Sequence, residues 1–361
     1  MTKYISLPVG RYGELFLRTM STRNTAAQIL VVRLSSMGDV VLAASIFDAL
    51  NGRFPGCSIT MLSAQPWGTL FEQDPRVYRV VYRDDDAAVA SLGSIWWDAI
   101  VDLQNNRHTR TLCRRLSCTG WRGRFNKRHG RRLLLLGLRT GSPSSVGHVI
   151  ERYHQAAGFR VAAPDCSTRL IISAVMIDAC RSRFLPRDCT QTPVLALFPF
   201  SAWRNKEWPR SSFARVAAAF VLRGWNVVIF GGPGDRGAGK ELAAAVDHAA
   251  CRSLAGHTTL VESAACICSC SLALGNDTGL SHVARACGVP TGMLFGSTTR
   301  HLGFFPVGNP PFTVFELPLW CRPCHAHGGN VCLRGGRPCL ERMGWECVVA
   351  KLWELYQQSS S

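Results

Sequence analysis

The sequence has no uninterrupted apolar run of the roughly 20 residues that a membrane-spanning helix requires, so we expect no helix to cross a bilayer. Its N-terminus also lacks the basic, apolar and small-residue order of a secretory signal. We therefore expect a cytoplasmic protein, in a compartment where thiols stay reduced. Most of its 16 cysteines are scattered through the chain, many in apolar runs, where a free thiol behaves as a small hydrophobe. Residues 1–27 precede the first convincing strand and are interpreted as an N-terminal extension, with Met20 as an alternative start.

Acidic residues are scarce as well. The chain has 24 Asp and Glu against 41 Lys and Arg, which gives a formal net charge of +17 at pH 7. This imbalance indicates an anionic partner, which can be a nucleic acid, a phosphorylated lipid surface or an anionic small molecule. The basic residues are densest between residues 105 and 139.

The composition is otherwise that of a globular protein, with 47% hydrophobic and 18% charged residues, and a length of 361 residues favours two domains. Strands and helices alternate twice, from residue 28 and again from residue 192. This order predicts an α/β fold with two Rossmann-like domains and parallel sheets. The predicted boundaries are 28–175 for the first domain, 176–190 for a linker and 191–344 for the second domain. Ligands of such folds bind beyond the carboxyl ends of the strands, here in a cleft that the two domains face.

The first candidate site follows the first strand, in the segment RLSSMGDVVLAA (33–44). Asp39 opens the next helix, where it is either a helix cap or a functional carboxylate. Its place at the carboxyl end of a strand favours function, because a carboxylate there can act as general base on a hydroxyl nucleophile. The candidate contacts to the acceptor that carries this hydroxyl are Ser36, Gly38, Arg107 and Arg110.

The second candidate site is the segment FPFSAWRNKEWPRSSFA (198–214), where a strand ends in a polar loop. The loop carries Ser201 and Lys206, and Trp208 with Pro209 starts the next helix. A lysine above a strand end can clamp a phosphate as a point charge. An isolated lysine is more often a solvated surface residue, but the tryptophan and proline indicate a fixed loop.

The third and most specific site is LGNDTGLSHVARACGVPTGMLFGSTT (274–299). A strand-to-helix turn is formed by Asn276, Asp277, Thr278 and Gly279. Its N–H groups and hydroxyl favour an incoming phosphate, and the glycine lets the backbone approach closely. His282 lies in the first helical turn, near the same ligand. A capping turn would explain the aspartate and threonine, but not the whole arrangement.

These three motifs, in this order and at these separations, resemble family 9 glycosyltransferases, the ADP-heptose:lipopolysaccharide heptosyltransferases. The resemblance covers about residues 28–350 and is strongest at RLSSMGDVV and GNDTGLSHVARACGVP. It implies the GT-B fold, with two Rossmann-like domains facing a central cleft, and inverting transfer with no metal at the catalytic centre and no covalent intermediate. It also implies a C-terminal helix, 345–361, that packs back on the first domain.

The resemblance assigns roles to the candidate residues. Asp39 would deprotonate the acceptor hydroxyl, Lys206 would hold the donor diphosphate, and the turn from Asp277 to Gly279 would bind the donor phosphates and sugar. Ser201 matches a position where the family often places a phosphate-facing hydroxyl. The family often has an acidic residue, commonly glutamate, for the nucleotide ribose; this chain reads GGPGDRG (231–237), and Asp235 is the candidate substitute.

The same resemblance implies the partners: ADP-heptose, a phosphorylated lipopolysaccharide core acceptor, and the anionic inner face of the inner membrane, where the enzyme would be peripheral. It implies no nucleic acid and no cofactor required for catalysis. Two alternatives stay open: a glycosyltransferase of the same fold that acts on a protein or another glycan, and a nucleic-acid-binding protein that uses residues 105–139 and a four-cysteine site.

That four-cysteine site lies in the segment 321–339, with the spacing C-x2-C-x7-C-x6-C. Its members are Cys321, Cys324, Cys332 and Cys339. Four thiolates at such spacing suit tetrahedral zinc or a single iron, with a structural rather than catalytic role. The alternatives are a disulfide pair or packed thiols without a metal.

Overall fold

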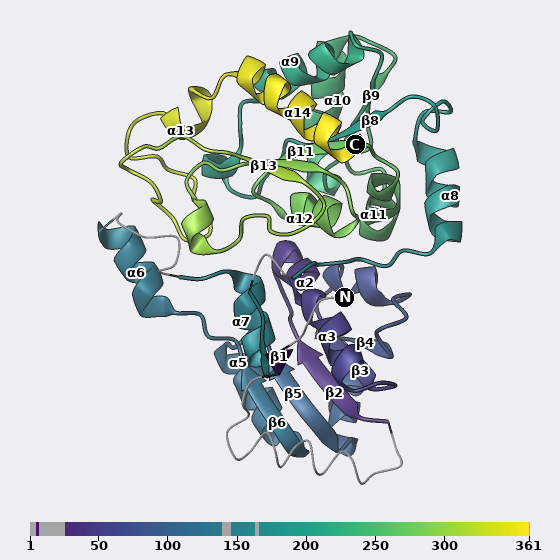
Figure 1. Cartoon of the computed structure of the whole chain (residues 1–361), viewed down its shortest axis with the longest axis vertical. Helices are drawn as coiled ribbons and strands as arrows, with labels where there is room; N and C mark the ends of the chain where they lie inside the picture. Colours follow the sequence, from purple (N-terminus) through teal and green to yellow (C-terminus); the bar gives the residue numbers. More distant parts are fainter. Residues whose placement is uncertain (1–4, 7–25, 139–145, 163–165, 361) are drawn as a thin grey trace. The chain divides into compact units, whose positions relative to one another are not determined.

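The computed structural model describes residues 5–6, 26–138, 146–162 and 166–360 (Figure 1). The chain forms two compact units. Unit 1 consists of Met1–Lys127 and His148–Ile171, and unit 2 of Arg128–Gly147 and Ile172–Ser361. The segment 128–147 therefore groups with the second unit, whereas the sequence predicted a first domain that runs without interruption from 28 to 175.

Unit 1 is built on a five-stranded parallel sheet with the strand order β4-β3-β2-β5-β6. The strands are β2 (Gln28–Val32), β3 (Ser58–Ser63), β4 (Arg79–Tyr82), β5 (Trp97–Asp102) and β6 (Cys118–Arg124). The central strand β2 is buried from Ile29 to Val32, as its apolar run predicts for a parallel strand covered on both faces. Of the N-terminal extension, β1 (Ile5–Ser6) pairs antiparallel with β7 (Phe159–Arg160), and residues 1–4 and 7–25 lie outside the described part.

Most of the described α-helices of unit 1 begin at a polar N-cap residue; α3 (Ser45–Arg53), which follows Ala44, does not. They are α2 (Met37–Ala43), α3 (Ser45–Arg53), α4 (Asp86–Ser91), α5 (Arg107–Arg115) and α7 (Val149–Ala156), with the 3-10 turns η1 (Trp67–Phe71) and η2 (Leu92–Ser94). Asn106 caps α5 by accepting from Thr109 N at 2.9 Å, and His148 caps α7 by accepting from Ile150 N at 3.2 Å. Since β2 and β5 are parallel neighbours, α2 and α5 start at the same carboxyl edge of the sheet.

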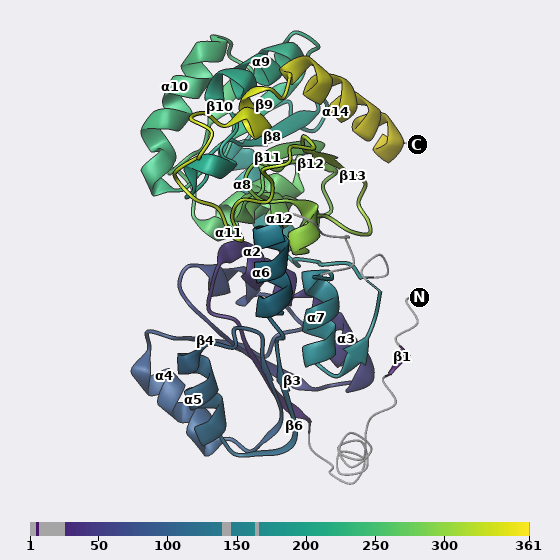
Figure 2. The ribbon, with the colours of Figure 1, turned by 90° about the vertical axis from the view of Figure 1, so that its left-hand side faces the viewer.

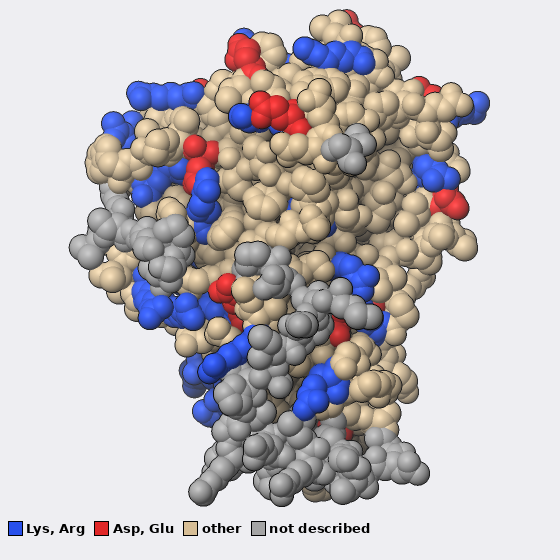
Figure 3. Space-filling model, in the orientation of Figure 1, with Lys and Arg blue, Asp and Glu red and all other residues tan. Residues whose placement is uncertain are grey.

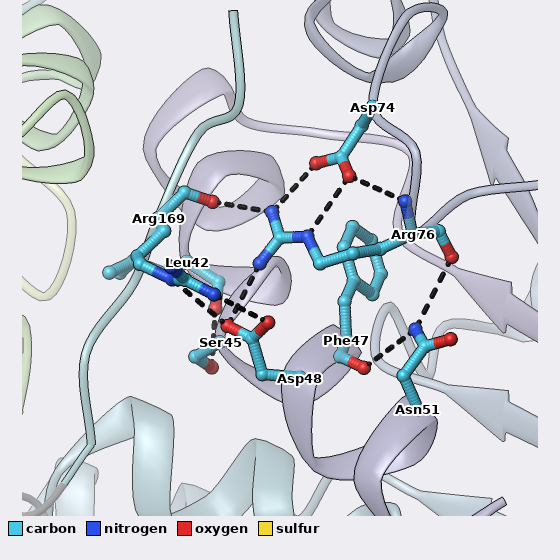
Figure 4. Close-up of polar contacts among 8 residues, drawn as sticks. All are labelled: Leu42, Ser45, Phe47, Asp48, Asn51, Asp74, Arg76 and Arg169. Atoms are coloured by element: carbon cyan, nitrogen blue, oxygen red, sulfur yellow. Dashed lines mark hydrogen bonds and ion pairs between the residues drawn. The ribbon is translucent and has the colours of Figure 1, made fainter. Parts of the chain in front are cut away.

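A network of charges holds three segments of unit 1 together (Figure 4). The guanidinium of Arg76, which is buried, lies 2.6 Å from Asp74 Oδ2 and 2.9 Å from Asp48 Oδ2 on α3. It also donates to Arg169 O at 2.7 Å, and the side chain of Arg169 reaches Asp48 Oδ1 at 2.9 Å. The last segment of unit 1, which ends at Ile171, is thereby fixed to α3.

Unit 2 is built on a six-stranded parallel sheet with the order β10-β9-β8-β11-β12-β13 (Figure 2). The strands are β8 (Val194–Phe198), β9 (Asn226–Ile229), β10 (Cys251–Ser253), β11 (Leu272–Asn276), β12 (Thr291–Leu294) and β13 (Phe312–Phe315). The middle strands β8 and β11 are buried over their full length. Both units thus have the parallel sheet that the sequence predicted, and the prediction of two Rossmann-like domains is confirmed.

Several of the described helices of unit 2 pack against one another in two groups. They are α6 (His129–Leu138), α8 (Ala174–Phe184), α9 (Arg210–Val221), α10 (Arg236–Val246), α11 (Leu260–Cys268), α12 (Gly279–Ala286), α13 (Pro338–Glu341) and α14 (Trp345–Ser360), with the 3-10 turns η4 (Arg204–Lys206), η5 (Pro233–Asp235) and η6 (Arg300–Leu302). One group joins α10 and α14 to α9, and the other joins α8 and α12 to α11.

The predicted linker 176–190 is largely helical, which corrects the prediction. Most of it belongs to α8, whose start is capped by Ser173, since its hydroxyl accepts from Met176 N at 3.3 Å. Cys180 is buried, and its carbonyl accepts from Cys266 Sγ on α11 at 3.8 Å. The flanking prolines suggested a connection, but the apolar side of this segment packs as part of unit 2.

The C-terminal helix also differs from the prediction that it packs on the first domain. Its apolar stripe belongs to the main core of unit 2 and consists of Val348, Val349, Leu352 and Leu355. Trp353 stacks on Phe220 of α9 with ring centroids 5.2 Å apart and planes 4° apart. The residues were correctly interpreted as a buried stripe, but the surface that covers them is on α9 and β13.

Candidate functional site

Asp39 lies at the third residue of α2, directly beyond the central strand of unit 1. Its Oδ2 accepts from Ser36 N at 3.3 Å and from Ser36 Oγ at 3.1 Å, and Arg33 Nη2 lies 2.7 Å from the same oxygen. Its Oδ1 accepts from the hydroxyl of Tyr153 at 3.1 Å. The side chain is 15% exposed, and its carboxylate accepts the N–H of Ser36 in a capping box at the start of α2. The interpretation as a helix cap is therefore confirmed, and the interpretation as a functional carboxylate stays a prediction.

The surroundings of Asp39 keep it ionised. Burial alone would raise its pKa, but the charge of Arg33 and the hydrogen bonds from Ser36 and Tyr153 outweigh this, and the pKa lies below the usual value. Arg33 is fixed in turn, because its Nη1 donates to Leu103 O at 2.6 Å. Burial raises the pKa of Tyr153 well above its usual value, so the phenol stays a hydrogen-bond donor.

Arg33 and Tyr153 are site residues that the sequence analysis missed. Arg33 stands in the first motif, where a cation before a serine turn was a usable signal. Tyr153 follows from no local pattern, because α7 reaches Asp39 only through the fold. That helix lies close against β6: Trp121 Nε1 donates to Ala156 O at 2.8 Å, and a methyl group on Gly123 would collide with the same carbonyl.

The predicted acceptor contacts lie at this edge of the sheet. Ser36 is exposed and bonded to Asp39, and Gly38 is the second residue of α2. Arg107 and Arg110 are exposed at the start of α5. The two parts of the edge are joined by Gln104, whose Oε1 accepts from Leu34 N at 3.1 Å and from Ser35 N at 3.3 Å. Whether these residues bind an acceptor stays a prediction.

In unit 2 the structure pairs two residues that the sequence analysis treated separately. Lys206 Nζ lies 2.7 Å from Asp277 Oδ2, with the two side chains 13% and 7% exposed. Thr298 Oγ1 donates to the same carboxylate oxygen at 2.8 Å. Burial would raise the pKa of Asp277, but Lys206, with smaller contributions from His282 and Thr298, brings it below its usual value. Asp277 therefore holds the lysine in place and offsets its charge.

The helix α12 begins beside this pair. Thr278 is its N-cap, with an extended backbone and no hydrogen bond from its own side chain to the cap position, and Gly279 is its first residue. Both are half-buried, and His282 in the next turn is 7% exposed. The first N–H groups of a helix have no partner within the helix and favour an anion. This start, with Lys206, can bind a phosphate.

Asn276 has a different role from the one expected. It is 0% exposed, and its amide is bonded to protein at both ends. Nδ2 donates to Pro199 O at 2.8 Å, and Oδ1 accepts from Trp208 N at 3.0 Å. The residue thus ties the loop after β8 to the end of β11. It positions the loop of Lys206 rather than facing a phosphate.

A pocket of about 450 Å³ opens in unit 2 beside Ser201. It is lined by Ser201, Ala202, Arg204, Glu207, Trp208, Pro209, Arg210, Asn330 and Arg337. Three arginines face one glutamate there, which favours an anion. Arg337 also fixes the loop, since its Nη1 donates to the carbonyls of Arg204 and Glu207 at 2.8 Å each. Lys206 is not among the lining residues of this pocket.

Asp235 lies in the turn after β9, at the predicted end of that strand. Its Oδ2 accepts from Gly232 N at 2.8 Å, which closes the turn that starts α10. The residue is half-buried and stands at the carboxyl edge of the sheet. Its contact with a nucleotide ribose stays a prediction, and the structure gives it a local capping role as well.

The four cysteines of segment 321–339 differ in exposure. Cys324 is exposed and Cys339 is buried, and burial followed by the neighbouring thiols raises the pKa of Cys339 to about 11, although Arg322 lowers it. No disulfide joins any two of the described cysteines, so the disulfide alternative is not realised. Within the described ranges, no three His, Cys, Asp or Glu side chains are arranged to hold a metal ion. The donor set suits zinc or iron, but its present arrangement does not form a site.

The surface repeats the charge imbalance of the sequence. Figure 3 shows more Lys and Arg than Asp and Glu on the face that it draws. Part of the basic segment 105–139 is used internally, however. Arg122 donates to Cys113 O at 2.5 Å and to Leu116 O at 2.6 Å, and Arg132 is buried. Among the helices described, none is long and apolar enough to span a membrane.

Comparison with known proteins adds an independent finding. The model of glycosyltransferase family 9 (heptosyltransferase) matches residues 87–330. Lipopolysaccharide heptosyltransferase 2 of Salmonella typhimurium is 26% identical over 295 residues, which cover 75% of this chain and 83% of that protein.

Solved structures show the same fold. The Escherichia coli ADP-heptose lipopolysaccharide heptosyltransferase II has a TM-score of 0.70 and 24% identity, over 92% of this chain and 100% of that one. A family 9 glycosyl transferase from Veillonella parvula has a TM-score of 0.71 and 20% identity, over 92% and 98%. The family model covers more than half of the chain, and both Rossmann-like domains have counterparts in these structures. The chain therefore belongs to glycosyltransferase family 9, the heptosyltransferases, and is a glycosyltransferase with the GT-B fold.

Proposed function

We propose that this enzyme transfers L-glycero-D-manno-heptose from ADP-heptose to a Kdo- or heptosyl-lipid A acceptor of the lipopolysaccharide inner core, with inversion at the transferred carbon. The observation that carries the proposal is the carboxylate of Asp39, ionised, held by Arg33 and Tyr153, and accessible at the carboxyl edge of its sheet. Inversion needs one base and one displacement, and unit 1 offers one such carboxylate in the first motif.

In the proposed step, the acceptor oxygen forms a bond to C1 of the heptose while the bond from C1 to the diphosphate oxygen breaks. ADP leaves with the bonding electron pair, and the hydroxyl proton passes to Asp39. A carboxylate of lowered pKa is a weak base, so the proton moves late, once bond formation has made the hydroxyl acidic. Oδ1 accepts one hydrogen bond from Tyr153 and has a further lone pair for this proton.

The departing diphosphate is stabilised by the cations and dipoles of unit 2. Lys206 and the start of α12 supply them at one point, and the arginine-lined pocket beside Ser201 supplies more. Asp277 keeps Lys206 in position, but it also offsets part of its charge, so the lysine alone does not account for diphosphate binding. Asp235, at the end of β9, is placed for the nucleotide ribose.

The acceptor end of the proposal rests on exposed cations. Arg107 and Arg110 stand at the start of α5 and favour the phosphate groups of a phosphorylated core sugar. A lipid-anchored acceptor also requires work at a membrane surface, and the net charge of +17 favours the anionic inner face of the inner membrane. We therefore propose a cytoplasmic, peripheral enzyme. We do not propose the alternative of a nucleic-acid-binding module, because the family shown is one of glycosyltransferases.

For the segment 321–339 we propose a structural role, with zinc or iron bound by thiolates. The support is the donor chemistry of the four cysteines, whose spacing suits tetrahedral zinc or a single iron.

The purified protein should be offered ADP-heptose and, separately, UDP-sugars, each with a core acceptor, and transfer read by mass. A mass gain of one heptose from ADP-heptose alone supports the proposal. Transfer from a UDP-sugar alone would replace the donor, and no transfer to the core with transfer to a protein would replace the acceptor.

A further inference from the structure

The helix α6 turns two neighbouring leucines toward solvent. Leu133 is 72% and Leu134 is 57% exposed. A single exposed leucine is common on protein surfaces, whereas two adjacent ones on the same helix call for an explanation. The helix does have an inner face. Leu135 is 2% exposed and packs with Val146 and Leu302, so the outward position of its two neighbours does not result from an unattached helix.

The arrangement of the helix keeps these leucines uncovered. At about 100° per residue, Gly130, Leu133, Leu134 and Gly137 share one side of the helix, opposite to Arg132 and Leu135. The two glycines have no side chains that could cover the leucines. At the borders of this exposed side stand His129 and Arg131, both exposed. The result is an apolar ridge between basic residues.

We propose that the ridge formed by Leu133 and Leu134 inserts into the interfacial region of an anionic lipid bilayer. This inference rests on the proposed function, because a lipid-anchored acceptor is what would bring the enzyme to a membrane. Charge favours this occupant, because the exposed Arg131 beside the leucines and the net charge of +17 are both complementary to an anionic bilayer. Basic residues with leucines between them are the side chains of interfacial helices, since long basic side chains reach the headgroups while apolar ones enter the acyl boundary.

Insertion differs from electrostatic adsorption in its response to salt. Attraction between exposed charges and headgroups is screened, with a Debye length of about 3 Å at 1 M salt, whereas burial of leucine is not weakened by salt. Binding by the ridge therefore has a part that persists in salt and depends on the leucines. The contribution of Arg131 belongs to the part that salt removes.

The test is co-sedimentation of the full chain with vesicles of phosphatidylcholine, with and without phosphatidylglycerol, at low and at high salt. Replacing Leu133→Gln and Leu134→Gln together should weaken binding on the order of tenfold at both salt concentrations. Leu133→Phe with Leu134→Phe should keep it. Arg131→Gln should weaken binding at low salt only. The matched control is Leu222→Gln with Leu333→Gln, two leucines of unit 2 that are 85% and 91% exposed, and it should bind as the unchanged protein does.

Two further measurements keep the outcomes distinct. ADP binding by calorimetry, and transfer to a water-soluble core acceptor without lipid, should be unchanged in the glutamine variant. Failure of the unchanged enzyme to transfer heptose would contradict the proposed function and leave the vesicle result intact. Equal vesicle binding by the glutamine variant and the control, or a loss in both, would overturn the inference. So would an oligomer that the glutamine variant dissociates, because the ridge would then be an interface between copies.

Discussion

The hydroxyl of Tyr153 donates a hydrogen bond of 3.1 Å to Oδ1 of Asp39 across 114 residues of sequence. The contact joins the helix after the first strand to the last long helix of unit 1. It leaves Oδ2 to Arg33 and Ser36, so the two carboxylate oxygens have different partners.

Replacing Asp39→Asn should lower kcat by about 10²–10⁴-fold, the usual loss on removing a general base. The amide keeps the shape of the side chain, so ADP affinity by calorimetry should stay near normal. The matched control is Asp84→Asn, a half-exposed aspartate of the same unit paired with Arg83, which should leave kcat unchanged. Near-normal turnover in Asp39→Asn would remove the base assignment.

The variant Tyr153→Phe should shift the pH dependence of kcat/KM. The phenol lowers the pKa of Asp39, so its removal raises that pKa, and the acid limb of the profile moves to higher pH. Because Arg33 and Ser36 still hold the carboxylate in this variant, the limb should move but the group should stay acidic. The ring stays packed on Phe125, so the fold should hold. An unmoved limb, or one moved to lower pH, would contradict the role of this contact.

In unit 2, Lys206→Ala should weaken binding of ADP more than binding of adenosine, by about 1.5–3 kcal/mol for the lost charge-assisted contact. The loss should exceed that of the double variant Lys206→Ala with Asp277→Asn. The reason is that the single change leaves a buried, unpaired carboxylate next to the diphosphate. Calorimetry on both variants and on Asp277→Asn completes the cycle. Additive losses would contradict the coupling of Lys206 to Asp277, and equal losses for ADP and adenosine would make Lys206 a purely structural residue.

The cysteine segment allows a comparison between a buried and an exposed thiol. If a metal is bound, Cys324→Ser and Cys339→Ser should lower the thermal midpoint by similar amounts, because each removes a ligand. Without a metal, only Cys339→Ser should do so, since Cys339 packs in the core and Cys324 is exposed. Elemental analysis of protein purified without chelator should then find about one zinc or iron per chain. Absence of metal together with a silent Cys324→Ser would leave packed thiols as the explanation.

The charge network of unit 1 should respond unequally to removal of its two arginines. Arg76→Ala leaves Asp74, which is 0% exposed on its side chain, without its partner and should destabilise by about 3–5 kcal/mol. Arg169→Ala removes a cation that is 59% exposed and should cost about 1 kcal/mol or less. Urea unfolding measures both. Equal losses of stability in the two variants would contradict the burial of Asp74 and Arg76 in this network.

Much of the fold followed from the sequence because burial in parallel sheets leaves a local record. The runs at β2, β8 and β11 are mostly apolar, and each is followed by a polar turn at the sheet edge. The sequence does not show which other element packs against a buried face. The stripe of α14 was recognisable, but its docking on α9 depends on aromatic contacts such as Trp353 with Phe220. For the same reason, the sequence did not predict that residues 128–147 group with unit 2.

The candidate site was recognisable where chemistry and strand ends coincide, as at Asp39, Lys206 and Asp277. The sequence does not show which of these side chains contact one another in the folded protein. Lys206 and Asp277 are 71 residues apart, and neither motif shows that one neutralises the other. In the sequence Asn276 resembles a ligand contact in a phosphate turn, yet its amide donates to Pro199 O and accepts from Trp208 N.

Gly123 decides how deeply Tyr153 sits, although it is not part of the reaction. The absence of a side chain there lets β6 approach the end of α7, where Trp121 meets Ala156. Any larger residue would push this helix outward and draw the phenol away from Asp39. A saturation scan would therefore report position 123 as intolerant as the base itself. Loss of activity in such a scan would then arise from the close approach of β6 and α7, at a buried position of the sheet.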